Sequence, residues 1–176
     1  MNKRTRQAII ESFQKLVSQK SFDKITVDMI LQDAEVSRAT FYRYFKDKYD
    51  VMNQIHIIKV ENCIAMSHSY EELFYYMLLF SKSNMLMIQQ LFSSTGVNSF
   101  SSFLSEQTAR VIERITRKNR GGQAFTKEET LQVDLVCHGI SHVSRRWVSE
   151  DYDISPKEAA HAIAMLLPEQ LRNYWC

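Results

Sequence analysis

The chain has 176 residues, 45% hydrophobic and 24% charged, with a formal net charge of +2, so it can bury a real core in one or two compact units. Only 4 Gly and 2 Pro, together with long helical periodicities, predict an all-α protein. Three cysteines without close spacing exclude a disulfide framework and a zinc signature, and the absence of a signal peptide or a membrane-length apolar stretch predicts a cytoplasmic protein.

Charge is divided unevenly along the chain. Residues 1–48 hold ten Lys and Arg against six Asp and Glu, a net charge of +4, and the remainder carries −2. A basic N-terminal module on a mildly acidic body is typical of a protein that binds phosphates with one end. The cluster of Lys3, Arg4 and Arg6 fits either a solvated tail or an arm that reaches the DNA backbone.

The N-terminal segment predicts three short helices. Ile9, Phe13, Leu16 and Val17 recur at helical spacing and form the first of them. Residues 26–45 then predict a second helix, a tight turn and a third helix, with Thr26 and Ser37 as the N-caps. Such a pair is the layout of a helix-turn-helix, whose second helix enters the DNA major groove.

The third helix has two distinct sides. It can bury Phe41 and Phe45, which are four residues apart, and leave a basic and polar side outward. Arginine has the donor fork that suits guanine, alanine and threonine can contact the thymine methyl, and polar side chains at the margin can hold phosphates. We expect base contacts from Arg38, Ala39, Thr40, Arg43 and Tyr44, and phosphate contacts from Tyr42 and Lys48. The alternative is an ordinary helical hairpin with solvated charges.

About the first fifty residues resemble the TetR family of bacterial transcription regulators. The matching positions are Ile9, Leu16, Phe22, Thr26, Val27, Ile30, Ala34, Val36, Ser37, Thr40, Phe41, Tyr42, Tyr44, Phe45 and Lys48. The resemblance implies an N-terminal helix-turn-helix DNA-binding domain at residues 1–48 and a C-terminal helical ligand-binding and dimerisation domain at residues 49–176. The DNA-binding residues predicted with it are Thr26, Ser37, Arg38, Ala39, Thr40, Tyr42, Arg43, Tyr44 and Lys48.

Two residues depart from the family pattern. Glu35 stands where the family usually has glycine in the turn, and Leu31 stands where it usually has alanine. A non-glycine residue at positive φ costs on the order of 1 kcal/mol. We therefore expect a slightly altered turn and a small repulsion between Glu35 and DNA.

The body of the chain predicts further helices at about 47–68, 70–83, 85–92, 99–116, 126–149 and 155–174, with a candidate mobile loop at 117–122. Capping boxes open the last two helices at Thr126 and Ser155, and Pro168 should kink or stop the last one near Leu167. These two helices either complete the monomer core or, as the resemblance implies, pair across a two-fold axis in a homodimer. That symmetry sets two reading helices one DNA turn apart, so the expected operator is palindromic double-stranded DNA.

The middle of the chain is rich in methionine and aromatic residues, which fit either plain core packing or a deformable pocket for a small-molecule effector. The pocket interpretation names Phe74, Met77, Phe103, His138 and His142. The two histidines lie four residues apart on one helix face, but no further ligands are marked, so we expect no metal. We also expect no cofactor and no membrane partner.

These features favour a transcriptional repressor whose operator affinity is modulated by a small molecule bound in the C-terminal domain. The alternative is a coactivator or protein-interaction subunit with the same fold, since the C-terminal half resembles the regulators of dihydroxyacetone kinase operons. We expect no enzyme, because the sequence lacks a Ser-His-Asp order, a carboxylate pair, a phosphate loop and a nucleotide fingerprint.

Overall fold

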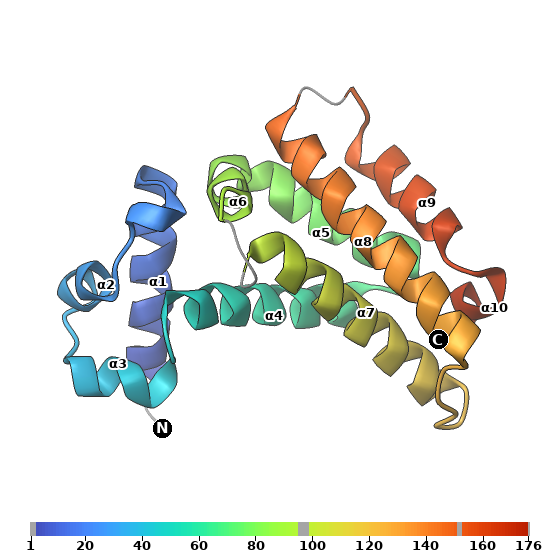
Figure 1. Ribbon diagram of the computed structural model, residues 1–176, viewed down its shortest axis with the longest axis horizontal. Coiled ribbons are helices and arrows are strands. Elements are labelled where there is room, and N and C mark those ends of the chain that lie inside the picture. Colours follow the sequence, from blue (N-terminus) through green and yellow to red (C-terminus); the bar gives the residue numbers. More distant parts are fainter. Residues whose placement is uncertain (1–2, 95–98, 151–152, 176) are drawn as a thin grey trace. The chain divides into compact units, whose positions relative to one another are not determined.

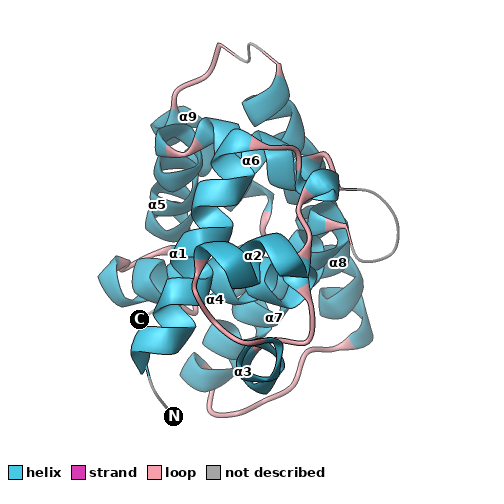
Figure 2. Cartoon of the chain, turned by 90° about the vertical axis from the view of Figure 1, so that its left-hand side faces the viewer, coloured by secondary structure: helices cyan, strands magenta, loops and turns pink. Residues whose placement is uncertain are grey.

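The computed structural model describes residues 3–94, 99–150 and 153–175, and these ranges contain helices and loops but no strand (Figure 2). The predicted all-α class is confirmed. The elements are α1 Lys3–Gln19, the 3₁₀ helix η1 Phe22–Lys24, α2 Val27–Asp33, α3 Arg38–Tyr44, α4 Lys48–Met66, α5 Tyr70–Ser83, α6 Met85–Phe92, α7 Phe100–Asn119, α8 Lys127–Ser149, α9 Pro156–Leu166 and α10 Glu169–Arg172.

Internal contacts divide the chain into two compact units. The first unit comprises Met1–Ile58 and Leu86–Phe100, and the second comprises Lys59–Met85 and Ser101–Cys176. The chain passes from one unit to the other within α4. The functional boundary that we expect after residue 48 stays a prediction.

The first unit contains the three predicted N-terminal helices, with α2 and α3 beside α1 (Figure 1). Polar contacts reinforce the apolar core between α1 and α2. Ser12 Oγ donates to the carbonyl of Ile30 at 3.3 Å, and the Lys15 ammonium pairs with the Asp33 carboxylate at 2.5 Å. Lys15 also lowers the pKa of the Asp33 carboxyl. The core residues of this segment are Ile9, Phe13, Leu16, Val17, Phe22, Ile25, Ile30, Phe41 and Phe45.

The basic residues near the N-terminus belong to α1 and do not form a separate tail, and their contact with the DNA backbone stays a prediction. Arg6 is half-buried and donates to Oε1 of Gln54 at 3.0 Å. Its guanidinium carbon lies 5.7 Å from the centre of the Phe45 ring. Arg6 therefore stabilises the packing of α1 against the end of α3 and the start of α4.

A buried histidine lies in the same unit. His56 of α4 packs edge-to-face on Phe100, with the ring centres 5.6 Å apart, and Phe100 packs on Phe92 at 5.0 Å. Burial lowers the pKa of His56 to about 4. The imidazole is therefore neutral at neutral pH and behaves as part of an aromatic cluster.

The second unit packs α5 against α9 and α8. Its buried polar anchor is Tyr70, whose hydroxyl donates to the carbonyl of Ile112 at 3.2 Å and lies 2.9 Å from the Thr116 hydroxyl. Burial raises the pKa of Tyr70 to about 12, so the phenol stays neutral. The Trp175 indole donates to the carbonyl of Ser67 at 3.2 Å and ties the C-terminal segment to the start of α5.

The connection between α7 and α8 is held by side chains, which does not support a mobile segment. Gly121 and Gly122 supply the positive φ values of 73° and 87° that the turn needs. The Arg120 guanidinium pairs with Glu129 at 2.8 Å, and the two side chains are only 6% and 13% exposed. Arg120 also lowers the pKa of the Glu129 carboxyl.

Both predicted capping boxes are confirmed. Thr126 opens α8 and Ser155 opens α9, each accepting from the backbone of a glutamate three residues later that bonds back to the cap. The helix stops at Leu166, because Leu167 is extended before Pro168. The expected helix 155–174 is therefore α9, a break at Leu167 and Pro168, and the short α10.

Candidate nucleic-acid interface

The helix-turn-helix pair is defined by its two caps. The Thr26 hydroxyl accepts from the amide of Met29 at 3.3 Å and opens α2, while the Ser37 hydroxyl accepts from the amide of Thr40 at 3.1 Å and opens α3. Both predicted N-caps are confirmed. The cap fixes where α3 begins and therefore which of its residues point outward.

The turn between α2 and α3 closes as a Schellman motif. The amide of Val36 donates to the carbonyl of Leu31 at 3.1 Å, and the amide of Glu35 donates to Gln32 at 3.4 Å. Glu35 has a φ of 52° and is the one non-glycine residue with positive φ among the described residues. The expected strain at this position is confirmed, and it costs on the order of 1 kcal/mol.

The two sides of α3 separate as the spacing predicts. Phe41 and Phe45 are fully buried, with their ring centres 5.8 Å apart. Arg38, Ala39, Tyr42 and Arg43 are exposed, as is the cap Ser37, whereas Thr40 and Tyr44 are half-buried. A polar and basic surface therefore covers the N-terminal part of α3, the part of a reading helix that reaches base edges.

Two of the predicted DNA-binding side chains have intramolecular partners that the sequence did not reveal. The guanidinium of Arg38 pairs with the carboxylate of Asp28 in the first turn of α2, and both side chains are exposed. The guanidinium of Arg43 lies 5.3 Å from the centre of the Tyr44 ring. Arg38 must exchange Asp28 for a base before it can read DNA.

Lys48 departs further from expectation. Its ammonium donates to three backbone carbonyls of the α1–α2 connection, and its side chain is half-buried. Thr26 is exposed, but its hydroxyl is used as the cap of α2. The assignment of these residues to DNA stays a prediction, and for Lys48 the contacts favour a different role.

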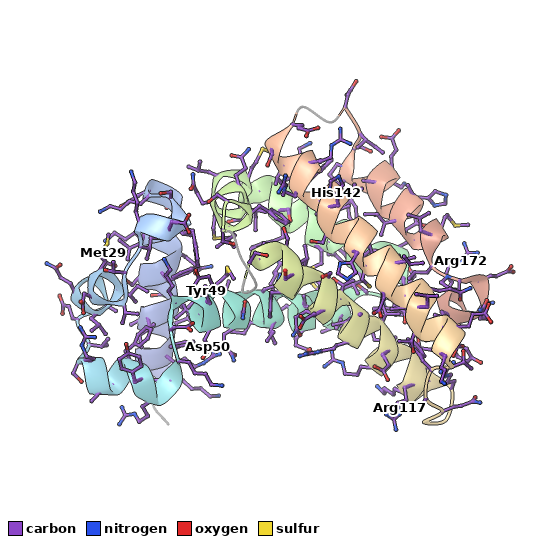
Figure 3. The ribbon with its side chains drawn as sticks, in the orientation of Figure 1. Met29, Tyr49, Asp50, Arg117, His142 and Arg172 are labelled. Carbon is purple, nitrogen blue, oxygen red and sulfur yellow. The ribbon has the colours of Figure 1, made fainter. Side chains whose placement is uncertain are left out.

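The residues predicted to line an effector pocket differ in burial. Phe74 is buried, Met77 and Phe103 are half-buried, and His138 and His142 are exposed. Both histidines lie on α8, where Figure 3 marks His142. The two histidines are thus exposed in this single chain whereas Phe74 is buried, and the effector pocket stays a prediction.

A hollow of the second unit has a different character. Its volume is about 440 Å³ and it lies beside α7, near the end that Figure 3 marks with Arg117. Its lining residues are charged apart from one glycine, whereas the pocket that the sequence suggested is lined by aromatic residues, methionine and histidine. The lining residues are Arg110, Glu113, Arg114, Arg117, Lys118 and Gly122.

The described ranges contain neither a metal site nor a membrane-spanning helix. Nowhere in them do three His, Cys, Asp or Glu side chains gather in a way that would hold a metal ion. No helix of these ranges combines the length and the apolar character that crossing a membrane requires. The surface of α2 and α3 is therefore the best-defined candidate site.

Comparisons with known proteins agree with this placement. Residues 9–55 match the model of the bacterial regulatory proteins of the tetR family, and residues 68–169 match a model described as a transcriptional regulator C-terminal region. No curated protein sequence matches the chain.

Solved structures share the fold at low sequence identity. The dihydroxyacetone kinase operon activator DhaS is 18% identical, with a TM-score of 0.65 over 98% of both chains. A TetR transcriptional regulator from Streptococcus agalactiae 2603V is 18% identical, with a TM-score of 0.65 over 93% of this chain and 94% of that one. A third, from Rhodococcus sp. RHA1, is 17% identical, with a TM-score of 0.59 over 97% of both.

Proposed function

The chain belongs to the tetR family of bacterial regulatory proteins, and from this membership we propose that it is a cytoplasmic repressor that reads operator DNA with α3. The observation that carries the proposal is the capped, Schellman-closed α2–α3 pair with an exposed basic surface over Phe41 and Phe45. Arg38 and Arg43 supply guanidinium forks for guanine edges, and Ala39 and Thr40 suit a thymine methyl. No catalytic role is proposed.

We propose that two copies pair through α8 and α9, so that the operator is palindromic. Support comes from large apolar side chains that the single chain leaves exposed on these two helices. On α8, Leu131 and Leu135 are one turn apart, and on α9, Met165 and Leu166 accompany them. Single exposed apolar residues are ordinary, but several large ones on two consecutive helices are typical of an interface.

Gly139 adds an independent argument for pairing. It lies inside α8, where glycine costs about 1 kcal/mol relative to alanine. A Cβ at this position would meet nothing within 4 Å in the single chain, so no contact of the monomer requires glycine there. A close approach by a partner helix would explain it.

We also propose that a small molecule bound in the second unit changes operator affinity. The support is the adaptable and aromatic character of Met77, Phe74 and Phe103, which are buried or half-buried in that unit. A ligand acts only through different affinities for the two states of the dimer. Screening apolar and aromatic ligands by their shift of the unfolding temperature, and then by release of operator DNA, tests this proposal.

The test of DNA reading is selection of duplexes from a randomised pool by the wild-type protein. A palindromic consensus is expected, and Arg38→Ala should lower its affinity by about 1–3 kcal/mol and relax one base position. Arg110→Ala on exposed α7 is the matched control and should leave the consensus unchanged. Enrichment of no sequence above the starting pool contradicts the proposal.

The sign of regulation is a separate measurement. An operon activator of the same fold stands among the structural neighbours, so activation is the second candidate. Transcription in vitro from the promoter upstream of the chain's own gene should fall when the protein is added. A rise in transcript, with or without a protein partner, replaces repression by activation.

A further inference from the structure

The side chain of Lys48 is used inside the protein. Its Nζ donates to the carbonyl oxygens of Ile25 at 2.8 Å, Phe22 at 2.9 Å and Asp23 at 3.3 Å. An ammonium has three N–H donors, and these three carbonyls account for all of them. A phosphate could be bound by this ammonium only in exchange for a carbonyl.

The surroundings of the ammonium also favour a fixed position. Nζ lies 4.6 Å from the centre of the Phe22 ring and 5.7 Å from that of Tyr49, close enough for attraction to both ring faces. Phe22 is fully buried, and Figure 3 marks Tyr49 at the start of α4. Burial lowers the pKa of Lys48, while the nearby carboxylates of Asp23 and Asp47 act in the opposite direction.

The three carbonyls belong to the η1 turn and to the residue that follows it. Ile25 directly precedes Thr26, whose hydroxyl caps α2. Lys48 is the first residue of α4, and the amide of Asp50 is capped by the Asp47 carboxylate at 2.8 Å, which fixes the start of that helix. A single side chain therefore links the beginning of α4 to the entry of α2.

We propose that Lys48 is a positioning residue that fixes α2, and with it the reading helix α3, relative to the start of α4, and that it is not a phosphate ligand. This inference rests on the proposed DNA reading. Because α4 is the helix by which the chain passes into the second unit, a change in the direction of α4 reaches α2 through this ammonium.

Two substitutions separate the two roles. Lys48→Arg keeps the charge and suits a phosphate, but a planar guanidinium cannot direct three donors at three converging carbonyls as an ammonium can. Lys48→Met keeps the length and removes charge and donors. Lys46→Met, at an exposed lysine two residues away, is the control for losing one positive charge.

The first measurement is affinity for a duplex selected by the wild-type protein and for a scrambled duplex, over a range of salt, well below the unfolding temperature of each variant. Positioning predicts that Lys48→Arg and Lys48→Met both lose about tenfold or more in affinity for the selected duplex. The salt slope of Lys48→Met should equal that of Lys46→Met, and Lys48→Arg should keep the wild-type slope. A purely structural role in stability would leave the affinity of the folded variants unchanged. Wild-type affinity in Lys48→Arg, with a slope in Lys48→Met lower by about one than in the control, overturns the inference.

The second measurement is amide hydrogen exchange of residues 25–30 in the full chain without DNA. Both Lys48 variants should exchange faster there than the wild type, and Lys46→Met should not. Unchanged exchange overturns the inference even where DNA binding is normal. If the Lys48 variants exchange faster but the wild-type protein selects no duplex, the proposed DNA reading is wrong, while the link between α4 and α2 is still supported.

Discussion

The strongest quantitative test of the proposed dimer is Leu135→Ala on α8. Leu135 is 67% exposed in the single chain. Full burial of a leucine contributes about 1.5–3 kcal/mol, so covering this exposed part contributes about 1–2 kcal/mol. A two-fold interface contains the residue twice, which brings the expected loss to about 2–4 kcal/mol and raises the dimer dissociation constant about 30- to 1,000-fold.

Leu135→Ala should not destabilise the single chain, so a rise in the dimer dissociation constant would not come from unfolding. Alanine is a better helix former than leucine, and the removed atoms make few contacts within the chain. Leu86→Ala on α6, where the leucine is 55% exposed, is the matched control. Sedimentation equilibrium gives the dissociation constants, and gel shift over protein concentration gives the consequence for DNA.

A dissociation constant of Leu135→Ala that stays within about threefold of the Leu86→Ala value would show that α8 does not form the interface. The same result from Leu166→Ala, at a position that is 65% exposed on α9, would remove both helices from the proposal. If the wild-type protein is monomeric in solution and still selects a palindrome, two copies associate only when they are bound to DNA.

Three further predictions concern single residues. Gly139→Ala should raise the unfolding free energy of the dilute monomer by about 1 kcal/mol, because alanine favours a helix more than glycine does, and should at the same time weaken the dimer. If the substitution stabilises monomer and dimer equally, no partner helix approaches closely at this residue. Asp28→Asn should raise operator affinity by up to about fivefold at low salt, because Arg38 then gives up no exposed ion pair, which is worth about 0.2–1 kcal/mol. Anisotropy titrations measure the gain, which should shrink in an Arg38→Ala background. His56→Gln should reduce the loss of stability in acid. Between pH 6.5 and about 4 the unfolded chain binds a proton at His56 and the folded chain does not, so the unfolding free energy of the wild type should fall by about 3 kcal/mol over this range. Urea unfolding measures this loss, and an equal loss in the variant would contradict the assignment to His56.

Local features of the fold were predictable because their causes lie within a few residues. A hydroxyl cap interacts with the amide three positions ahead, so Thr26, Ser37, Thr126 and Ser155 could be read from the chain. The stop of α9 before Pro168 has an equally local cause. The positive φ at Glu35 was expected for a different reason, because the family that the sequence resembles usually has glycine at this position of the turn.

The partners of long charged side chains were not predictable. Arg6 contacts Gln54, and Lys48 contacts Phe22, across 48 and 26 residues of sequence. In the sequence both residues count only as positive charge near a DNA reader, which is why an arm and a phosphate ligand were expected. Their true neighbours depend on how α1, η1 and α4 meet, and no spacing rule contains that information.

The pocket prediction had the same weakness. His138 and His142 lie on one face of α8, as their spacing requires, but spacing does not say which face α5 covers. Cys137 and Ile140 are buried instead, and the histidines are left on the side with Leu135. The buried face of a helix can be predicted only when its two faces differ in polarity, and α8 has apolar residues on both.

The exposed ion pair between Arg38 and Asp28 affects binding to the operator more than binding to other DNA. Residues 1–48 carry a net charge of +4, so they are attracted to the phosphates of any duplex. This contribution to the binding free energy carries no sequence information. Asp28 opposes base reading instead, because Arg38 must give up this carboxylate before it gains a base edge on DNA. A guanine edge returns two hydrogen bonds in a fixed geometry, whereas a wrong base leaves the arginine better off with Asp28. Removing the acid should therefore strengthen binding to the selected operator by a larger factor than binding to scrambled duplex, because only operator binding separates the pair. The ratio of the two affinities, measured at one salt concentration, tests this, and an equal gain on both duplexes would show that Arg38 leaves Asp28 on any DNA.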